Sequence, residues 1–290
     1  MPGRDLCSDA EAERRGFAGA VAARRREVLR ETLRAFEAAE PKDRYHQVAA
    51  ANLARWREQA RRRPLPASPL VEVLPGDWGE VTRAVTAASG ACFAVLNMAN
   101  AHVPGGAYVE GAAAQEENMF RRTDCHFRIG DDEYDRAADR YRAASTRRLC
   151  AADGAVPLDV RLPRVCIRGQ EDRSRADLGY AWLRDDEVFP FFELRAAAQD
   201  LRDGTAFDPR EARRRIAAQL DTLVAHGVRH AVLGAFGCGA FCNPAEAVAA
   251  IYRAEIEARR PAFVRIAFAV FAAGYGPGNF APFARVLAGT

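Results

Sequence analysis

Lysine is almost absent from this chain: Lys42 is the only one, so nearly all of the positive charge is carried by arginine. A preference this general is better explained by a GC-rich genome than by selection for phosphate recognition. The net charge is only +3, and the basic excess lies in residues 1–63. The arginine runs at 24–26 and 61–63 are not interleaved with aromatic residues, so we expect solvated helix faces and no specific nucleic-acid partner.

Long apolar runs are also missing. No stretch approaches the roughly 20 uninterrupted apolar residues that a membrane helix requires, and residues 1–9 lack the apolar core of a secretory signal. We therefore expect a cytoplasmic protein with no membrane partner. The seven cysteines are an odd, widely spaced set, which is typical of reduced thiols. Cys238 and Cys242 have no second pair at metal-ligand spacing, so no metal site is predicted.

The chain divides into a helical extension and a longer region in which strands and helices alternate. Apolar residues recur at helical spacing over 28–36, and a second helix is expected over 43–60. The proline-rich stretch 64–69 marks the end of this extension, which covers residues 1–64. The alternation from residue 70 onward predicts a single domain over 1–290, because a chain of 290 residues can bury one large core.

The alternating region indicates an α/β fold. Strands are expected at 70–73, 91–98, 164–167, within 188–198, at 230–233 and at 263–271. Helices are expected at 78–88, through most of 115–150, at 209–226, at 243–259 and after the glycine-rich stretch 274–278. This pattern predicts a mixed or mostly parallel central sheet between helices, a three-layer sandwich with ligands near the carboxyl ends of the strands.

The first loop of interest follows the apolar run 91–98 and contains a Pro-Gly-Gly turn and a Gln-Glu-Glu triplet. Gly105 and Gly106 have no Cβ, so the backbone can approach a sugar or phosphate closely. Glu116 and Glu117 stand where a helix begins, and acidic residues there usually only stabilise the helix. The glycine pair, the buried strand and Asn100 just upstream together favour a functional interpretation.

The second loop, residues 234–243, reads Gly-Ala-Phe-Gly-Cys-Gly-Ala-Phe-Cys-Asn and follows the strand 230–233. Asn243 is a good N-cap, Pro244 suits the first helical position, and Glu246 has capping-box spacing. A strand, a glycine-rich turn and a helix start are typical of a diphosphate site. Phe236 and Phe241 are each either pocket aromatics for ribose or adenine or core residues.

These two loops resemble those of the macrodomain poly(ADP-ribose) glycohydrolases, in particular their microbial branch, and residues 26–33 resemble the amino-terminal extension of that branch. The resemblance lies in 24–36, 95–125 and 230–275. It implies a macrodomain-like fold, ADP-ribose as ligand, and no cofactor or metal. It places the catalytic glutamate at Glu117, its ribose-binding neighbour at Glu116 and a contact to the distal ribose at Asn100. The other expected substrate-binding residues are Gly105, Gly106, Ala107, Gln115, Gly234, Ala235, Phe236, Gly237, Cys238, Gly239, Ala240 and Phe241.

Two features differ from the family. The loop of the family has three glycines, whereas the third position here is Ala107, and residues 125–205 match nothing recognisable. The substrate is therefore open between poly(ADP-ribose) and a mono-ADP-ribosylated protein, for example one modified on arginine. Glycosidases usually place two carboxylates on opposite sides of the bond. Because Glu116 and Glu117 are adjacent, Glu117 alone is expected to serve as general acid and then general base.

Two other classes of protein, a non-catalytic reader and an oxidoreductase, share some of these sequence features. A non-catalytic ADP-ribose reader would have the same fold and second loop but would not need an acid at position 117. An NAD-dependent oxidoreductase would need Gly-x-Gly-x-x-Gly followed by an acidic residue about 20 positions on. The glycine spacing at 234–239 is the reverse of that motif, which argues against this class.

Overall fold

The computed structural model describes residues 6–62, 70–272 and 278–289, without the side chains of 6–17. The proline-rich boundary expected at 64–69 and residues 274–277 lie outside the described residues. The helices are α1 (Leu6–Glu37), α2 (Arg44–Arg62), α3 (Trp78–Ser89), α4 (Gln115–Arg122), α5 (Ala143–Leu149), α6 (Pro209–Ala225), α7 (Ala245–Ala258) and α8 (Phe280–Leu287). The strands are β1 (Val71–Pro75), β2 (Ala94–Met98), β3 (Tyr134–Asp135), β4 (Arg140–Tyr141), β5 (Arg164–Cys166), β6 (Phe189–Ala196), β7 (His230–Leu233) and β8 (Arg265–Val270).

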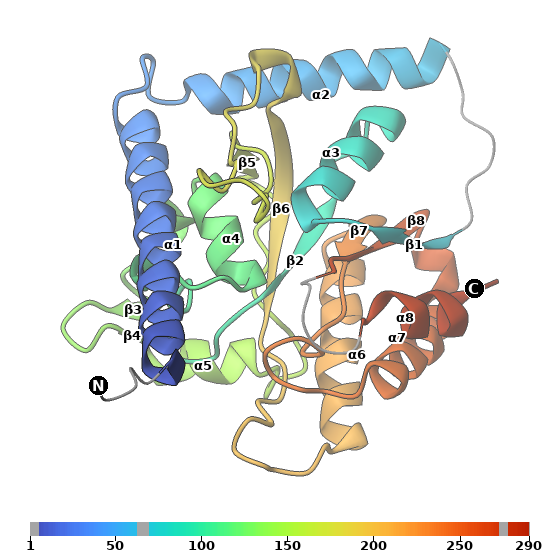
Figure 1. Ribbon diagram of the computed structural model, residues 1–290. Helices are drawn as coiled ribbons and strands as arrows, with labels where there is room; N and C mark the ends of the chain where they lie inside the picture. Colours follow the sequence, from blue (N-terminus) through green and yellow to red (C-terminus); the bar gives the residue numbers. More distant parts are fainter. Residues whose placement is uncertain (1–5, 63–69, 273–277, 290) are drawn as a thin grey trace, which may run out of the picture.

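Six of the strands form one mixed sheet in the order β1-β8-β7-β2-β6-β5 (Figure 1). All neighbours in it pair in parallel except β5, which is antiparallel to β6. Parallel strands end at the same edge of a sheet, so the loops that follow β2 and β7 leave the same edge. β2 and β7 are also direct neighbours. The two loops expected to carry the chemistry therefore begin side by side.

Helices cover both faces of the sheet because the side chains of a strand alternate between them. In β8, Ile266 and Phe268 join a core with α6, α7 and α8. Ala267 and Ala269 join a second core with α3, α4 and Trp56 of α2. The α/β three-layer sandwich with a mixed central sheet is thus confirmed. The first core draws on residues from Val71 to Leu287, while the single-domain organisation over 1–290 stays a prediction.

The helical extension packs across one side of the sandwich (Figure 1). α1 lies against α4, where the Thr32 hydroxyl donates to the carbonyl of Arg121 over 2.7 Å. α2 crosses α3 and β6, and the Asn52 amide donates to the carbonyls of Asp185 and Val188. Among the described residues, none of the helices has both the length and the apolar character to cross a membrane.

Residues 115–150 are not largely helical, contrary to the expectation from their charge pattern. α4 ends at Arg122 because Thr123 forms a β-bridge with Cys166. The chain then forms a 3-10 turn, Cys125–Arg128, and the short β3–β4 hairpin before α5. The bridge joins residues more than forty positions apart in the sequence, and no helical periodicity can reveal such a contact.

The helix after the second loop also begins later than predicted. Pro244 is its N-cap, without a side-chain cap hydrogen bond, and α7 starts at Ala245. Asn243 does not cap the helix. Its amide instead donates to the carbonyls of Gln199, Gly237 and Phe241. Asn243 therefore holds the loop closed, and Glu246 forms an ion pair with Arg285 of α8 in place of a capping box.

Candidate active site

A cavity of about 540 Å³ opens at the carboxyl edge of the sheet, between the loops that follow β2 and β7. Both loops supply predicted site residues to its lining. From the first loop and α4 these are Asn100, Ala107, Gln115, Glu116 and Glu117, and from the second Gly234, Ala235, Gly237, Gly239, Ala240 and Phe241. The structure thus brings together eleven of the fifteen residues singled out in the sequence. The other four, Gly105, Gly106, Phe236 and Cys238, lie behind this lining.

Gln115 fixes the start of α4 against the end of β2. Its side-chain amide donates to the carbonyl of Leu96 over 2.9 Å, and its side-chain oxygen accepts from the N–H of Met98 at 2.9 Å. The side-chain amide of Gln115 therefore pairs with the backbone of β2 as the backbone of a neighbouring strand would. Both polar groups of Gln115 are therefore engaged with the sheet, and the residue positions the two glutamates that follow it.

Glu116 closes the first loop around its own carboxylate. One oxygen accepts from the N–H of Asn100 at 2.7 Å, and the other accepts from the N–H of Gly105 at 3.2 Å. The side chain is almost fully buried. Burial raises the pKa of Glu116 well above its usual range, and the charges of Glu117 and Glu193 raise it further, against the lowering effect of the two N–H donors.

Glu117 has one oxygen held and the other uncommitted. Oε1 accepts from the N–H of Ala107 at 3.2 Å. Oε2 is buried and has no hydrogen-bond partner among the described residues. A buried oxygen without a partner is costly, and in a native structure it commonly indicates a ligand or a catalytic role. Glu117 lines the cavity, and its Oε2 is therefore available to a ligand there.

The glycine pair makes room for this carboxylate. Gly106 has a φ of +58°, and a Cβ there would lie 2.4 Å from Oε1 of Glu117. Gly105 has a φ of +73°, and a Cβ there would meet the rings of Tyr108 and Phe120. Ala107 has a φ of −95°, which any residue adopts, so its methyl group lines the cavity without backbone strain. Only the first two positions require glycine.

The second loop leaves three consecutive N–H groups free. Gly239, Ala240 and Phe241 line the cavity, and their N–H groups donate no hydrogen bond within the part of the chain that the structure describes. A Cβ on Gly239 would meet nothing within 4 Å. Successive unpaired N–H groups make an anion-binding concavity, so the expected diphosphate site has donors available.

Phe236 and Cys238 lie on the core side of this loop. Phe236 is 2% exposed and belongs to the core that contains α6 and α7, so of its two possible roles the structure favours that of a core aromatic. Burial raises the pKa of Cys238 to about 12, and its thiol therefore stays neutral. Phe241 is only partly buried and lines the cavity, with the guanidinium of Arg202 5.0 Å from its ring centre.

A buried polar network supports α4 from behind. Arg25 of α1 forms a 2.7 Å ion pair with Glu171, whose other oxygen accepts from the Tyr180 hydroxyl at 2.5 Å. The same hydroxyl accepts from Asn118 and Arg121 of α4. Burial alone would raise the pKa of Glu171, but the hydrogen bonds from Arg25 and Tyr180 lower it to about 2. The helical extension is thereby connected to the helix that carries the two glutamates.

Metal binding is not supported by any side-chain cluster in the described ranges. Across residues 18–62, 70–272 and 278–289, no three His, Cys, Asp or Glu side chains lie together in a way that could hold an ion. The metal-independent chemistry implied by the resemblance stays a prediction.

Comparison with known proteins finds a family model that matches part of the chain. Residues 22–150 match the family model described as the catalytic domain of microbial-type PARG, a segment that includes the first loop and both glutamates. Over this segment the chain is similar to the microbial-type poly(ADP-ribose) glycohydrolases. The match ends before the second loop, and no curated protein sequence matches the chain significantly.

Solved structures of two poly(ADP-ribose) glycohydrolases share the fold. The poly(ADP-ribose) glycohydrolase of Thermomonospora curvata superimposes with a TM-score of 0.61 at 24% identity, covering 91% of this chain and 99% of that one. The same enzyme bound to the inhibitor ADP-HPD gives a TM-score of 0.60 at 24% identity, with 90% and 98% coverage. The Deinococcus radiodurans enzyme in complex with ADP-ribose gives 0.54 at 21% identity, with 82% and 92% coverage. The macrodomain-like fold expected from the sequence is confirmed.

The lining also contains residues that were not predicted, among them Arg173, Arg202 and Phe271. Phe271 follows β8 directly, and its position at the carboxyl end of a parallel strand was a signal that could have identified it. Arg173 lies in the polar stretch after β5, and Arg202 follows β6. Neither has a motif around it, and only the folding of distant loops over the sheet edge brings these arginines to the cavity.

Proposed function

We propose that the cavity binds ADP-ribose and that the protein hydrolyses the glycosidic bond attached to its distal ribose. The observation that carries this proposal is the buried, unpartnered Oε2 of Glu117, which lies in the same cavity as the free N–H groups at 239–241. An acid for the leaving group and donors for a diphosphate are the two requirements of such a reaction. The family match and the shared fold support the same activity.

In this mechanism Glu117 protonates the leaving oxygen and then removes a proton from the attacking water. Its Oε1 stays bonded to the Ala107 N–H, which sets the orientation of the carboxyl group, while Oε2 is free to reach the scissile oxygen. Because the second loop holds the diphosphate, the reacting bond is presented to Glu117 in a fixed position. Positioning and fixed dipoles then supply much of the rate acceleration.

Glu116 is assigned to the ribose and to the shape of the loop. Its two oxygens already accept from Asn100 and Gly105, so a ribose hydroxyl would share an oxygen that is held in place by the backbone. The Oδ1 of Asn100 likewise accepts from the N–H groups of His102 and Val103. Its amide NH₂ is left to donate to the distal ribose.

The substrate is poly(ADP-ribose) in our proposal, with a mono-ADP-ribosylated protein, for example one modified on arginine, as the second candidate. Ala107 favours the second candidate, because its methyl group takes up space that a third glycine would leave open. A non-catalytic reader is disfavoured by the buried free oxygen of Glu117, which binding alone does not need. The cytoplasmic location stays a prediction.

The test is incubation of the protein with poly(ADP-ribose) and, in parallel, with proteins modified singly on arginine, serine or glutamate, while released ADP-ribose is measured. Each reaction is run with and without EDTA. Release from the polymer that persists in EDTA supports the proposal. Release only from a mono-modified protein identifies the second candidate, and tight ADP-ribose binding with no release from any substrate identifies a reader. Activity that is lost in EDTA and restored by magnesium or zinc contradicts the mechanism.

A further inference from the structure

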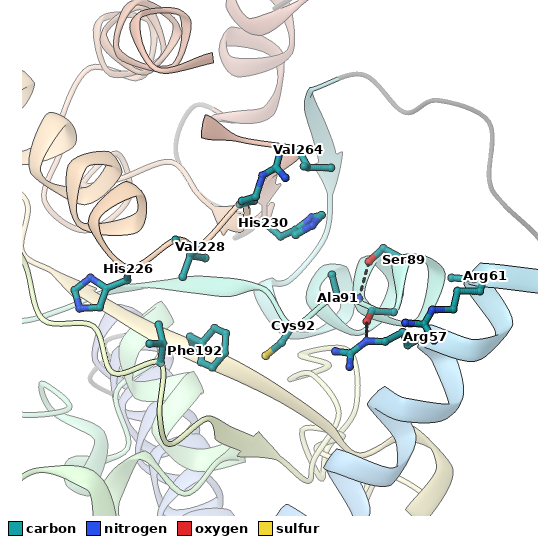
Figure 2. A pocket seen from close by; sticks show the side chains of 15 residues that line it. Arg57, Arg61, Ser89, Ala91, Cys92, Phe192, His226, Val228, His230 and Val264 are labelled. Carbon is teal, nitrogen blue, oxygen red and sulfur yellow. Dashed lines mark hydrogen bonds between the residues drawn. The ribbon is translucent and has the colours of Figure 1, made fainter. Parts of the chain in front are cut away.

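A second hollow lies at the opposite edge of the sheet, where β2, β7 and β8 begin. Its volume is about 690 Å³, and it shares no lining residue with the cavity that contains Glu117. Arg57 and Arg61 line it from α2, and His226 and His230 line it from the turn into β7 (Figure 2). Arg229, between these two histidines in the sequence, belongs to the same lining. We call it the amino-edge hollow.

The amino-edge hollow carries positive charge without any acidic residue in its lining. Among the described residues, Arg57, Arg61 and Arg229 have no carboxylate within ion-pair distance. The Nε of Arg57 donates to the carbonyl of Gly90 at 3.3 Å, and its terminal nitrogens have no partner in the described part of the chain. Arginines elsewhere in the fold, such as Arg122 and Arg164, are paired with buried carboxylates.

The floor of the hollow does not offset this charge. Phe192 and Val228 are apolar, and burial raises the pKa of Cys92 to about 12, so its thiol is neutral. Burial lowers the pKa of His230, and the positive charges of Arg229 and Arg265 lower it further. The Nδ1 of His230 is buried and has no partner in the described ranges. The hollow is therefore a concave, electropositive surface with an apolar floor.

We propose that the amino-edge hollow binds a phosphate-bearing stretch of poly(ADP-ribose) distant from the unit being cleaved, through the guanidinium groups of Arg57, Arg61 and Arg229. The planar guanidinium group of arginine can donate two parallel hydrogen bonds to the oxygens of one phosphate. The apolar floor suits the face of an adenine or ribose between two diphosphates.

This inference rests on the proposed function, because the polymer is the polyanion that the active site would already hold. Once one unit is bound at the carboxyl edge, the rest of the same chain reaches the opposite edge at a high effective concentration. Even weak binding at the hollow would then favour long chains. A five-residue strand such as β2 separates the two edges by roughly 17 Å, so the unit held in the cavity cannot itself reach the hollow. The short oligomers of the test are therefore limited to one or two units, which leave little or no chain to pass around the outside of the protein to the opposite edge.

The test variant is Arg57→Gln combined with Arg61→Gln and Arg229→Gln. Its matched control is Arg140→Gln with Arg148→Gln and Arg210→Gln, three exposed arginines that line neither cavity and so change the net charge equally. Hydrolysis of long and short poly(ADP-ribose) is measured for both. Binding of both lengths is measured in a Glu117→Gln background at several salt concentrations, with single-stranded RNA as a competitor.

We expect KM for long polymer to rise at least about tenfold in the test variant with kcat unchanged, and no change with short oligomers. The slope of log affinity against log salt should fall by about 0.7 for each phosphate that the variant no longer neutralises. Equal effects in the control, equal effects on short oligomers, or loss of RNA binding without loss of polymer binding would overturn the proposal. If the wild type cleaves no substrate, the proposed function fails while the binding arm still decides the role of the hollow.

Discussion

The two loops at the carboxyl edge of the sheet use their backbone N–H groups in opposite ways. In the first loop, the N–H groups of Asn100, Gly105 and Ala107 are bonded to the carboxylates of Glu116 and Glu117. In the second loop, the N–H groups at 239–241 are bonded to nothing in the described ranges. Both loops are glycine-rich and both follow a central parallel strand, so glycine content alone does not distinguish them.

What distinguishes them is that the helix at the end of the first loop, α4, carries two carboxylates that accept from the loop's own N–H groups. The carboxylates of Glu116 and Glu117 occupy N–H groups of the first loop. These bonds hold the two side chains in place and make the loop unsuited to binding an external anion. The second loop has no acid, so its donors remain available for the phosphates of a ligand. A single cavity thus combines a carboxylate held by the first loop with N–H groups of the second loop that have no partner among the described residues.

The largest effect is expected from Glu117→Gln, which removes the proton while keeping the shape of the side chain. We expect kcat to fall at least about a hundredfold, since general acid–base catalysis is typically worth about 10² to 10⁴ in rate. ADP-ribose affinity, measured by calorimetry, should stay within a few-fold because the phosphate donors are on the other loop. The control is Glu110→Gln, an exposed glutamate of the first loop that does not line the cavity. A Glu117→Gln protein that retains wild-type kcat would show that the acid lies elsewhere.

The second loop is tested by Gly239→Val, which should weaken ADP-ribose binding about tenfold or more, as expected when one well-placed hydrogen bond to a charged group is removed. The added side chain enters space in which a Cβ meets no atom within 4 Å, so thermal stability should change little. Gly239→Ala is the graded control and should have a smaller effect. Unchanged affinity in a folded Gly239→Val protein would place the phosphates away from this loop.

The buried acid of the first loop should make stability depend on pH. Because burial raises the pKa of Glu116, the folded protein binds its proton more tightly than the unfolded chain does. The resulting stabilisation is complete below the unfolded pKa of about 4.3 and is lost as the pH rises toward the folded pKa. Glu116→Gln carries no such proton. The difference in Tm, Glu116→Gln minus wild type, should therefore be more positive at pH 8 than at pH 5. Each kcal/mol of unfolding free energy that the wild type loses between these pH values corresponds to about 2–4 °C.

An equal Tm difference at the two pH values would mean that Glu116 is ionised in the folded protein throughout this range. The same variant should also raise KM and lower kcat together, because Glu116 holds the backbone of the first loop and, in the proposed mechanism, contacts the ribose.

The smallest effect is expected from Ala107→Gly. The φ of −95° allows either residue, and the N–H that orients Glu117 is kept, so only the volume of one methyl group changes. We expect a few-fold rise in activity on the polymer relative to mono-modified protein, measured as the ratio of kcat/KM values. Ala101→Gly, on the same loop and outside the cavity lining, is the control. A ratio that Ala107→Gly leaves unchanged would show that this methyl group does not select the substrate.

Much of the architecture was predictable because it depends on local patterns. Alternating apolar strands and amphipathic helices predicted the sandwich, and both loops that line the cavity were found from glycines and acids close together in sequence. The errors arose at contacts between distant residues. The Thr123–Cys166 bridge ended α4, and Gln199 drew Asn243 away from its expected capping role.

The sequence by itself determined which residues could do chemistry: Glu116 and Glu117 at a helix start, and a glycine-rich loop after a parallel strand. Only the tertiary structure decided which of their atoms are free. In the folded protein both oxygens of Glu116 accept from backbone N–H groups, and Phe236 packs in the core. The Oε2 of Glu117 has no hydrogen-bond partner among the described residues. The tertiary structure also gathered arginines from α2 and the turn before β7 into one hollow. The reason is that a hydrogen bond or a shared cavity depends on distances in space, and the folded sheet sets those distances between segments that the sequence keeps far apart.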